Sequence, residues 1–526
     1  MQLSAIFAIA LAAAAASLIY SRVRDALRHA ARARELGCKP PVRGFSSEPT
    51  GLLGVFYGIR ASRKHRFPDF VEEQMEALQQ HVGRPVGTVT MRTPFFQDSI
   101  FTLDPRNVQA ILATKFKDFK LGVNRTENFR PLLGNGIFAA NGEQWQHSRA
   151  LLRPQFVRSQ VSDLDLEEAH VKALMTVLER HLLRDGWTTL LDLQELFFRL
   201  TLDSATEFLF GESVNSQLEH GAQGPAAKGN VSFAQAFDSS QFTLSFGARL
   251  GSQYWLVHTP AFKKQVARVH TFVNHFVEIA MVQGSGEKRQ GSEKGDYVFL
   301  YALARETQDP EELRSQLLNI LLAGRDTTAS TLSWLFYTMA DAQYQHIFQR
   351  LRGVIVDEFG TYSNPKDISF ERMKSCQYLQ WCINECLRLY PAVSVNVRTA
   401  ETDTCLPTGG GPDGLDPVYV QKGQDVAYSV HVMHRRKDLW GPDAHVFRPE
   451  RWQDRRPGWD YLPFNGGPRI CIGQQFALTE IAYVVIRLMQ RIDAMDGSRI
   501  GPVKHRLTLT NCPADGVNVR LHFAAS

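Results

Sequence analysis

The sequence predicts a mainly α-helical protein with a small β portion. Most of the chain from about residue 46 to residue 395 carries apolar residues at the spacing of amphipathic helices. Short β-like runs replace this pattern between about residues 396 and 430, in VNVRTA, PVYVQ and DVAYSV. The tail, HRLTLTNCPADGVNVRLHF, predicts a β-hairpin with its turn near Asp515 and Gly516. We therefore expect one large, mostly helical domain over residues 46–526.

The first 20 residues carry no charged side chain, and arginines follow at once. As a helix, residues 3–20 would span about 27 Å, which is close to the thickness of a bilayer core. Because basic residues stay on the cytosolic side, the pattern predicts a single transmembrane anchor at residues 1–20 with the bulk of the chain in the cytosol. A cleaved signal peptide is the alternative, since small residues are abundant in this segment.

Residues 21–45 form a basic, proline-containing segment that we expect to link the anchor to the body. The chain has 59 Lys and Arg residues against 54 Asp and Glu residues, a formal net charge of +5, and this segment contains the whole excess. The rest of the chain is balanced, so no nucleic-acid partner is expected. The seven cysteines have neither disulfide-framework nor zinc spacing, which fits the reducing side of a membrane.

The longest predicted helix begins at DPEE and continues to about Ala340. Asp309 is a good N-cap, Pro310 suits the first helical position, and Glu312 would complete a capping box. The middle of this helix contains AGRDTT, in which a glycine and an acid, Asp326, interrupt an apolar run. Such a stretch is either a kinked or solvent-facing turn or a groove where a small ligand lies against the helix.

The stretch FNGGPRICIG presents one cysteine, Cys471, in a tight run of Gly, Pro and Arg. Glycines at this density let a bulky group approach the backbone, and the sulfur would contact that group. Weaker pairs occur elsewhere: Trp145 and Arg149 are four residues apart, and Glu385 and Arg388 are three apart, so each pair shares a helix face. Each pair alone is more often structural than functional.

The order of the motifs along the chain carries a resemblance. W-x-x-x-R comes first, and A-G-x-D-T-T, E-x-x-R, P-E-R-W and F-x-x-G-x-R-x-C-x-G follow. This series resembles the haem-thiolate monooxygenases of the cytochrome P-450 superfamily over essentially the whole body of the chain. ILLAGRDTTASTLSW, LPTGGGPDG and FNGGPRICIGQQFALTE are similar to its fungal alkane and fatty-acid hydroxylase branch. The resemblance implies the cytochrome P-450 fold with an N-terminal transmembrane helix.

The resemblance also implies one haem b, with the Cys471 thiolate as the axial ligand of its iron. Thiolate is a strong donor that favours oxygen activation. Phe464 is expected beside the sulfur, where it would exclude water. Cations are needed for the two buried haem propionates, and the positions that match propionate ligands are Trp145, Arg149, Arg398 and Arg469.

Asp326 and Thr327 match the acid–alcohol pair that, in this superfamily, delivers protons while the O–O bond is cleaved. The resemblance assigns Glu385, Arg388 and Arg451 to a buried network that is structural. It further implies O2 as the oxidant, an NADPH–cytochrome P-450 reductase as the electron donor, and a place in the endoplasmic reticulum membrane.

The expected substrate is a hydrophobic small molecule with a long aliphatic chain, such as an alkane or a fatty acid. Residues 116–138 are expected to form a loop over the haem, and residues 393–396 to face the substrate cavity. Phe237, Phe242 and Phe246 recur at helix-like spacing and are candidates for substrate contact. Core packing explains these three phenylalanines equally well.

Two other functions remain open. The same chemistry could act on a polyketide or lipid-like intermediate of a secondary-metabolite pathway. A haem protein that is not an oxygenase is the third alternative, but such a protein would be expected to lose the proton-delivery pair that Asp326 and Thr327 match.

Overall fold

The computed structural model describes residues 2–44, 50–93, 97–156, 164–217, 233–284 and 298–524. The chain divides into two compact units. The first comprises residues 1–57, 72–120 and 397–428, and the second comprises residues 58–71, 121–396 and 429–526. Helices dominate the second unit and most strands lie in the first, so the predicted class, mainly helical with a small β portion, is confirmed.

The first unit contains the largest sheet, in the strand order β1-β2-β3-β9-β6-β4. β2 and β3 pair antiparallel, whereas β3 and β9 pair in parallel, and β7 and β8 form a separate two-stranded sheet. The strands are β1 (Val42–Arg43), β2 (Thr88–Thr93), β3 (Gln97–Thr102), β4 (Phe119–Lys120), β6 (Val395–Ala400), β7 (Thr404–Gly410), β8 (Asp416–Val420) and β9 (Asp425–Ser429). The helices that begin in this unit are α1 (Gln2–Glu35), α2 (Leu52–Arg63), α4 (Pro105–Gln109), η2 (Ala110–Thr114) and η3 (Phe116–Asp118).

Three predicted β runs are confirmed as β6, β8 and β9. Strands β2 and β3, in contrast, lie where an amphipathic helix was expected, and β7 runs through LPTGG, between two of the predicted runs. Register explains the first difference, because a six-residue antiparallel ladder from Thr88–Thr102 to Thr93–Gln97 pairs the two strands throughout.

α1 (Gln2–Glu35) continues through the predicted anchor and most of the basic segment behind it. The side chains of residues 1–5, 8–10 and 18 lie outside the described part of the chain. Among the residues that are described, no helix is both long and apolar enough to cross a membrane. The predicted transmembrane anchor is therefore not supported.

The second unit is built from long helices. They are α3 (Phe67–Val82), which begins in this unit, α5 (Val123–Leu133), α6 (Gly142–Leu152), α8 (Leu164–Arg180), α9 (Leu193–Phe210), α10 (Phe233–Leu250), α11 (Pro260–Gly284), α12 (Phe299–Ala304), α13 (Pro310–Ala340), α14 (Gln345–Phe359), α15 (Phe370–Ser375), α16 (Gln377–Leu389), α17 (Val430–Met433), α18 (Lys437–Trp440) and α19 (Gln474–Arg491). Short turns of helix are η4 (Arg153–Phe156), η5 (Gly251–Val257), η6 (Ala342–Tyr344), η7 (Pro449–Trp452) and η8 (Gly467–Arg469). Its strands are β5 (Leu191–Asp192), β10 (Ile492–Asp496), β11 (His505–Leu507), β12 (Asn511–Pro513) and β13 (Asn518–Phe523).

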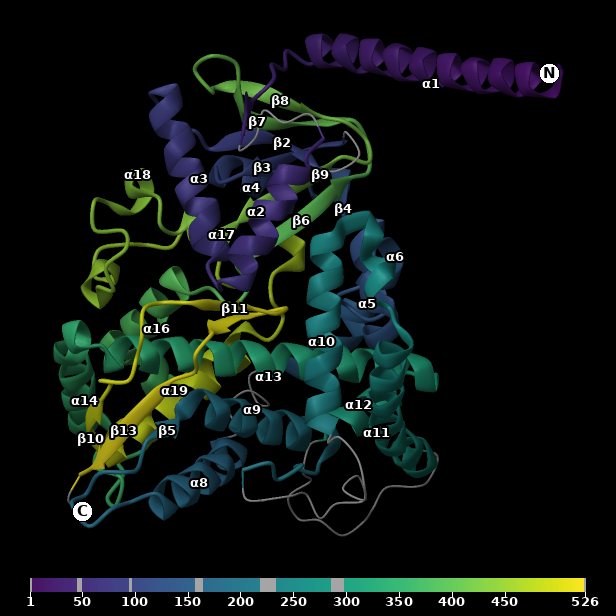
Figure 1. The fold of residues 1–526 in the computed structure, drawn as a ribbon. Coiled ribbons are helices and arrows are strands. Elements are labelled where there is room, and N and C mark those ends of the chain that lie inside the picture. The colour runs from purple at the N-terminus through teal and green to yellow at the C-terminus, as the bar shows by residue number, and fades with distance from the viewer. Residues whose placement is uncertain are drawn as a thin grey trace. The chain divides into compact units, whose positions relative to one another are not determined.

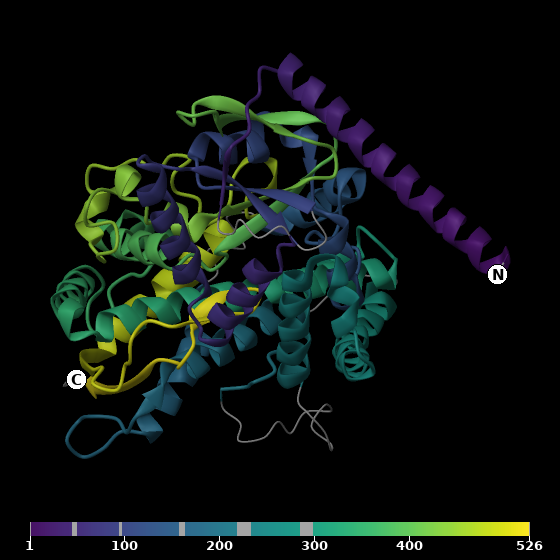
Figure 2. The ribbon, with the colours of Figure 1, turned by 45° about the horizontal axis from the view of Figure 1, so that its top comes forward.

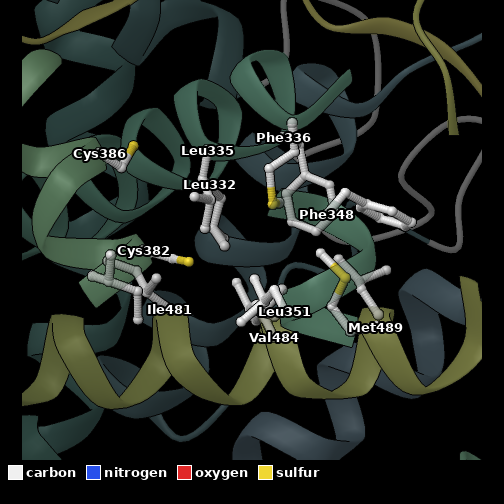
Figure 3. Close-up of a cluster of buried hydrophobic side chains, with 14 of the residues drawn as sticks. Leu332, Leu335, Phe336, Phe348, Leu351, Cys382, Cys386, Ile481, Val484 and Met489 are labelled. Atoms are coloured by element: carbon white, nitrogen blue, oxygen red, sulfur yellow. The ribbon is translucent and has the colours of Figure 1, made fainter. Parts of the chain in front are cut away.

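α13 is the long helix through the middle of the second unit, with α9 running beside it (Figures 1 and 2). Of its 31 residues, 24 are buried, so it crosses the core as the sequence predicts. Figure 3 shows the packing: Leu332, Leu335 and Phe336 of α13 meet side chains of α14, α16 and α19. Burying a leucine or phenylalanine contributes about 1.5–3 kcal/mol, so this cluster fixes the helices that position the site.

The ends of α13 lie where the sequence places them, but its capping differs. Asp309 accepts a hydrogen bond from the backbone N–H of Glu311 (2.9 Å). The Glu312 carboxylate accepts from the Thr307 hydroxyl (2.6 Å) and contacts His147 (2.8 Å). The expected capping box is therefore wrong, because the Glu312 side chain is engaged by partners outside the helix.

The tail also differs from its prediction. β11 pairs with β12, and the turn of that hairpin comes before Asn511. A turn is present near Asp515 and Gly516, but the strand after it, β13, pairs with β10 and β5 and not with β12. Gly516 has φ +76°, and a Cβ there would approach the Asp192 carboxylate to 2.4 Å. Asp192 also accepts from the Val517 N–H (2.8 Å). The chain after Gly516 therefore lies against Asp192 and continues into the pairing of β13 with β5.

Candidate active site

The loop that carries Cys471 is a tight backbone turn before α19. Cys471 N–H donates to the Phe464 carbonyl (3.0 Å), which closes the loop on itself. Asn465 and Gly467 both have positive φ, +64° and +67°. A Cβ on Gly466 would lie 2.8 Å from the Trp459 ring. The two glycines are therefore required by the turn itself and by the approach of Trp459.

The sulfur of Cys471 differs from the other six. All seven cysteines lie among the described residues, and Cys471 alone is exposed at its surface. Surrounding protein nevertheless desolvates the thiol and raises its pKa, while the Gly473 N–H and the Arg149 charge act in the opposite direction. Hydrogen-bond and charge partners of this kind stabilise a thiolate.

Two arginines and a tryptophan lie next to this sulfur loop. The Arg469 guanidinium lies 4.4 Å from the centre of the buried Trp145 ring, and that of Arg149 lies 5.9 Å from it. Arg149 donates to the carbonyl of Ile470 (3.0 Å), next to Cys471. Arg469 donates to the carbonyl of Ala140 (2.9 Å). Three predicted propionate ligands and the predicted iron ligand thus form one cluster.

A haem fits this cluster. It offers one accessible sulfur as an axial donor and two guanidinium groups for two carboxylates, which is the donor set that a haem with two propionates requires. Phe464, half-buried against the core cluster, belongs to the same loop. Arg398 lies on β6 in the first unit and donates to the carbonyl of its neighbour Val397 (2.9 Å).

The predicted acid–alcohol pair lies on continuous helix in α13. The Thr327 hydroxyl donates to the carbonyl of Ala323 (2.7 Å). Asp326 is 3% exposed, and burial raises the pKa of its carboxyl to about 6. Its Oδ1 has no hydrogen-bond partner among the described residues. A carboxyl with this pKa can hold or release a proton near neutral pH, as a proton relay requires.

The sequence alone did not reveal the polar neighbours of Asp326. Arg325 is buried beside it, with its Nη1 3.6 Å from Asp326 Oδ1, and pairs with Asp238 (2.5 Å). Gln241 of α10 donates a hydrogen bond to the Asp326 carboxyl, and this bond together with the Arg325 charge opposes the rise of its pKa. Asp238 is more than half exposed, so Arg325 and Asp238 connect the buried acid to the surface. The spacing of residues along α10 could not reveal the pair of Asp238 and Arg325, because Arg325 lies on α13.

A second buried acid lies on α19, nine residues after Cys471. Glu480 is 2% exposed, and burial raises the pKa of its carboxyl to about 7, while the nearby Thr328 and Ser204 hydroxyls oppose the rise. The signal was in FALTEIAYVV, where a single acid interrupts an apolar helix. The Ser204 hydroxyl also contacts the buried Glu167 of α8 (3.4 Å), so Ser204 lies between two buried carboxyl groups, Glu480 and Glu167.

The predicted buried network is present. Arg388 makes two hydrogen bonds to Glu385, at 2.9 and 2.8 Å, and both side chains are completely buried. Arg451 donates to the same carboxylate (3.2 Å), and so does the Trp452 indole (3.1 Å). Arg388 also donates to the backbone carbonyl of Ala444 (2.6 Å). The network therefore joins α16 to the segment that leads to the Cys471 loop.

The candidate substrate contacts are not equivalent. Phe237 is fully buried and stacks on Phe233, whereas Phe242 of the same helix is 60% exposed. Residues 123–133 form α5, so the expected loop over residues 116–138 is wrong for that part. Val393 and Val395 are exposed apolar side chains after α16. The spacing of the phenylalanines thus does not bring them to one face.

Comparisons with known proteins agree with this arrangement. A sequence model described as cytochrome P450 matches residues 59–511. The chain is 48% identical to cytochrome P450 monooxygenase g430 of a Fusarium species, over 99% of this chain and 91% of that protein. It is 47% identical to cytochrome P450 52A1 of Candida tropicalis, over 90% of this chain and 86% of that protein.

The fold is also similar to a solved structure, a cytochrome P450 (CYP102L1), with a TM-score of 0.71 at 20% identity over 93% of this chain and 99% of that one. The resemblance inferred from the ordered motifs is confirmed. Members of the family bind haem through a cysteine thiolate, which is the cofactor that the motifs imply. This chain therefore belongs to the cytochrome P450 family of haem-thiolate monooxygenases.

Proposed function

We propose that this monooxygenase hydroxylates C–H bonds of a long-chain aliphatic or lipid-like substrate, an alkane or a fatty acid, using O2 and electrons from NADPH. The observation that carries the reaction class is the accessible sulfur of Cys471, supported by the Gly473 N–H and the Arg149 charge. The substrate class is supported by the motif resemblance to alkane and fatty-acid hydroxylases and by the 47% identity to cytochrome P450 52A1.

In this proposal, Cys471 would ligate the haem iron, and its loop supplies partners for the thiolate that offset part of its desolvation. The Gly473 N–H stabilises the thiolate by hydrogen bonding, and Arg149 stabilises it by charge. Phe464 limits the access of water to the sulfur. Arg469 holds a propionate from the side of Trp145. When bound, the haem supplies the oxygen activation that no side chain can supply.

Proton supply falls to α13. The Thr327 hydroxyl, which donates to Ala323, reorients to donate toward the oxygen substrate. Asp326 passes protons to it, since its pKa of about 6 lets both protonation states occur near neutral pH. Asp326 is almost fully buried, and Arg325, which stays protonated and also pairs with the exposed Asp238, holds a positive charge beside it. Arg398 is proposed as a further propionate ligand.

The proposed electron donor is an NADPH–cytochrome P-450 reductase. The uncharged head of the chain and the arginines behind it support attachment to the endoplasmic reticulum membrane, with the catalytic body in the cytosol. Alkaline extraction of microsomes tests this attachment: the protein should stay with the membrane pellet, and release into the supernatant would contradict it.

A substrate panel tests the function. The haem-loaded full chain is titrated with alkanes and fatty acids of graded length, and then incubated with NADPH and reductase. We expect a Soret shift and hydroxylated product for at least one chain length. If none binds or reacts, while the protein keeps its thiolate spectrum, the alternative is favoured, namely oxidation of a polyketide or lipid-like pathway intermediate.

A further inference from the structure

Three side chains of metal-ligand type meet in the second unit, apart from the cysteine cluster. Asp69 lies at the start of α3, His431 on α17 and His505 on β11. One donor atom of each lies within 4.8 Å of the other two. Both histidines are buried, and Asp69 is partly buried. No motif in the sequence predicts this group, because its members are more than 70 residues apart.

His505 is oriented by a hydrogen bond on its far nitrogen. Its Nδ1 lies 2.9 Å from Asn511 Oδ1, and its backbone N–H donates to the carbonyl of His65 (2.6 Å). When Nδ1 donates to Asn511, Nε2 directs its lone pair toward Asp69 Oδ1, 3.3 Å away, without meeting hydrogen-bond geometry. When the ring is neutral, two lone pairs at this distance repel unless a proton or a metal ion lies between them. A histidine ligand oriented from behind in this way is usual at metal sites.

His431 supplies the second observation. It is fully buried, and neither ring nitrogen has a hydrogen-bond partner among the described residues. Burial lowers its pKa far below the ordinary value, with repulsion from Arg435 and His505 acting in the same direction. The imidazole is therefore neutral and has a free lone pair. A buried polar group left without a partner costs about 1–3 kcal/mol, so a ligand that satisfies it stabilises the fold.

We propose that Asp69, His431 and His505 bind one Zn²⁺ ion. Zinc–nitrogen and zinc–oxygen bonds of about 2.0–2.2 Å in tetrahedral geometry place neighbouring ligand atoms about 3.4 Å apart, close to the 3.3 Å between His505 and Asp69. Two imidazoles and one carboxylate favour zinc over Mg²⁺ or Ca²⁺, which prefer oxygen ligands. The fourth position is left for water or an exogenous ligand.

Nearby charges determine how strongly the site is expected to bind zinc. Arg66 contacts the other carboxylate oxygen of Asp69 (3.4 Å), and the Arg435 guanidinium interacts with Asp69 and His431. These cations compete with a metal for the one carboxylate, so we expect weaker binding than at a cysteine-rich structural site. Occupancy would still cross-link the chain, because the three ligands lie on three separate elements, α3, α17 and β11.

The test uses the haem-loaded full chain, stripped of loose metal by a chelator and titrated with Zn²⁺ against a competing chromophoric chelator. We expect one equivalent of zinc, a higher melting temperature when it is bound, and nitrogen scatterers of imidazole type in zinc-edge X-ray absorption. His431→Gln and His505→Gln should each weaken binding at least about 10-fold. His346→Gln, an exposed histidine on α14, is the matched control and should bind as the parent does.

Asp69→Asn serves as a second variant, because Asp69 is the least buried of the three. The substitution removes the carboxylate but keeps the size of the side chain, so it should weaken zinc binding without leaving a cavity. Circular dichroism and the haem spectrum verify that each variant is folded. The proposal is overturned if zinc does not bind stoichiometrically, if the three variants bind as tightly as the control, or if the absorption spectrum contains no imidazole. In the first case, Asp69 and His505 form an ion pair only.

Discussion

The Arg469 guanidinium lies 4.4 Å from the centre of the Trp145 ring, although the two residues belong to motifs at opposite ends of the chain. Arg149, one helical turn after Trp145, reaches back to the carbonyl of Ile470. The α6 helix and the Cys471 loop are thus joined by two cations that lie near one indole. This places two guanidinium groups next to the loop that carries Cys471.

Arg149→Leu and Arg469→Leu should each accelerate haem loss. A charge-assisted hydrogen bond contributes about 1.5–3 kcal/mol, so we expect haem dissociation to become about 10-fold faster or more. Transfer of haem to apomyoglobin measures this rate. Arg305→Leu, at an exposed arginine after α12, is the control. Equal rates for all three variants would contradict the propionate assignment.

Thr327→Ala should uncouple NADPH consumption from product formation. Without the hydroxyl, proton delivery is impaired, and product per NADPH should fall about 10- to 100-fold. Thr338→Ala removes a hydroxyl with the same backbone contact, to the residue four positions earlier on the same helix. That control should leave coupling unchanged. If both variants lower coupling equally, a general effect on α13 is responsible and the relay is wrong.

Glu385→Gln should destabilise the fold strongly. It leaves Arg388 and Arg451 buried without their carboxylate, and losing one partner of a buried pair costs about 3–5 kcal/mol. The Glu195–Arg199 pair on α9 is exposed, so Glu195→Gln should cost less than about 1 kcal/mol. Urea denaturation of the haem-loaded variants measures both. A small shift for Glu385→Gln would mean that the network contributes little.

Glu480→Gln should stabilise the protein at high pH. The carboxyl has a folded pKa of about 7 against a usual value of 4.5. As pH rises through this window, the unfolded chain loses its proton first, so the wild type loses up to about 3 kcal/mol. The glutamine cannot ionise, and its advantage should grow from pH 4.5 to 7 and then stay constant. Melting temperatures across this range test the sign, and an advantage that does not depend on pH would refute it.

Local sequence predicted the elements whose signals are local. α13 begins and ends where Asp309 and the apolar run indicate, and β6, β8 and β9 follow their alternating patterns. The Glu385 network was also predictable, because the pair lies on one helix face. The paired motifs Trp145–Arg149 and Arg469–Cys471 were found because their order along the chain is itself a signal.

Features that depend on pairing between distant segments were missed. Strands β2 and β3 are defined by each other, and β13 pairs with β10 and β5 instead of with the strand before its predicted turn. The Asp238–Arg325 path and the His431–His505 cluster likewise join residues whose separation in sequence carries no period. Such contacts follow from the tertiary arrangement, which a helical or strand pattern does not encode.

The ligation of iron by Cys471 is tested most directly by the carbon monoxide spectrum of the reduced, haem-loaded full chain. The account predicts the red-shifted Soret band of a thiolate-ligated haem in the parent protein, and its loss in Cys471→His while circular dichroism remains unchanged. A folded parent protein that binds haem and lacks this band, or a Cys471→His variant that keeps it, would contradict the account.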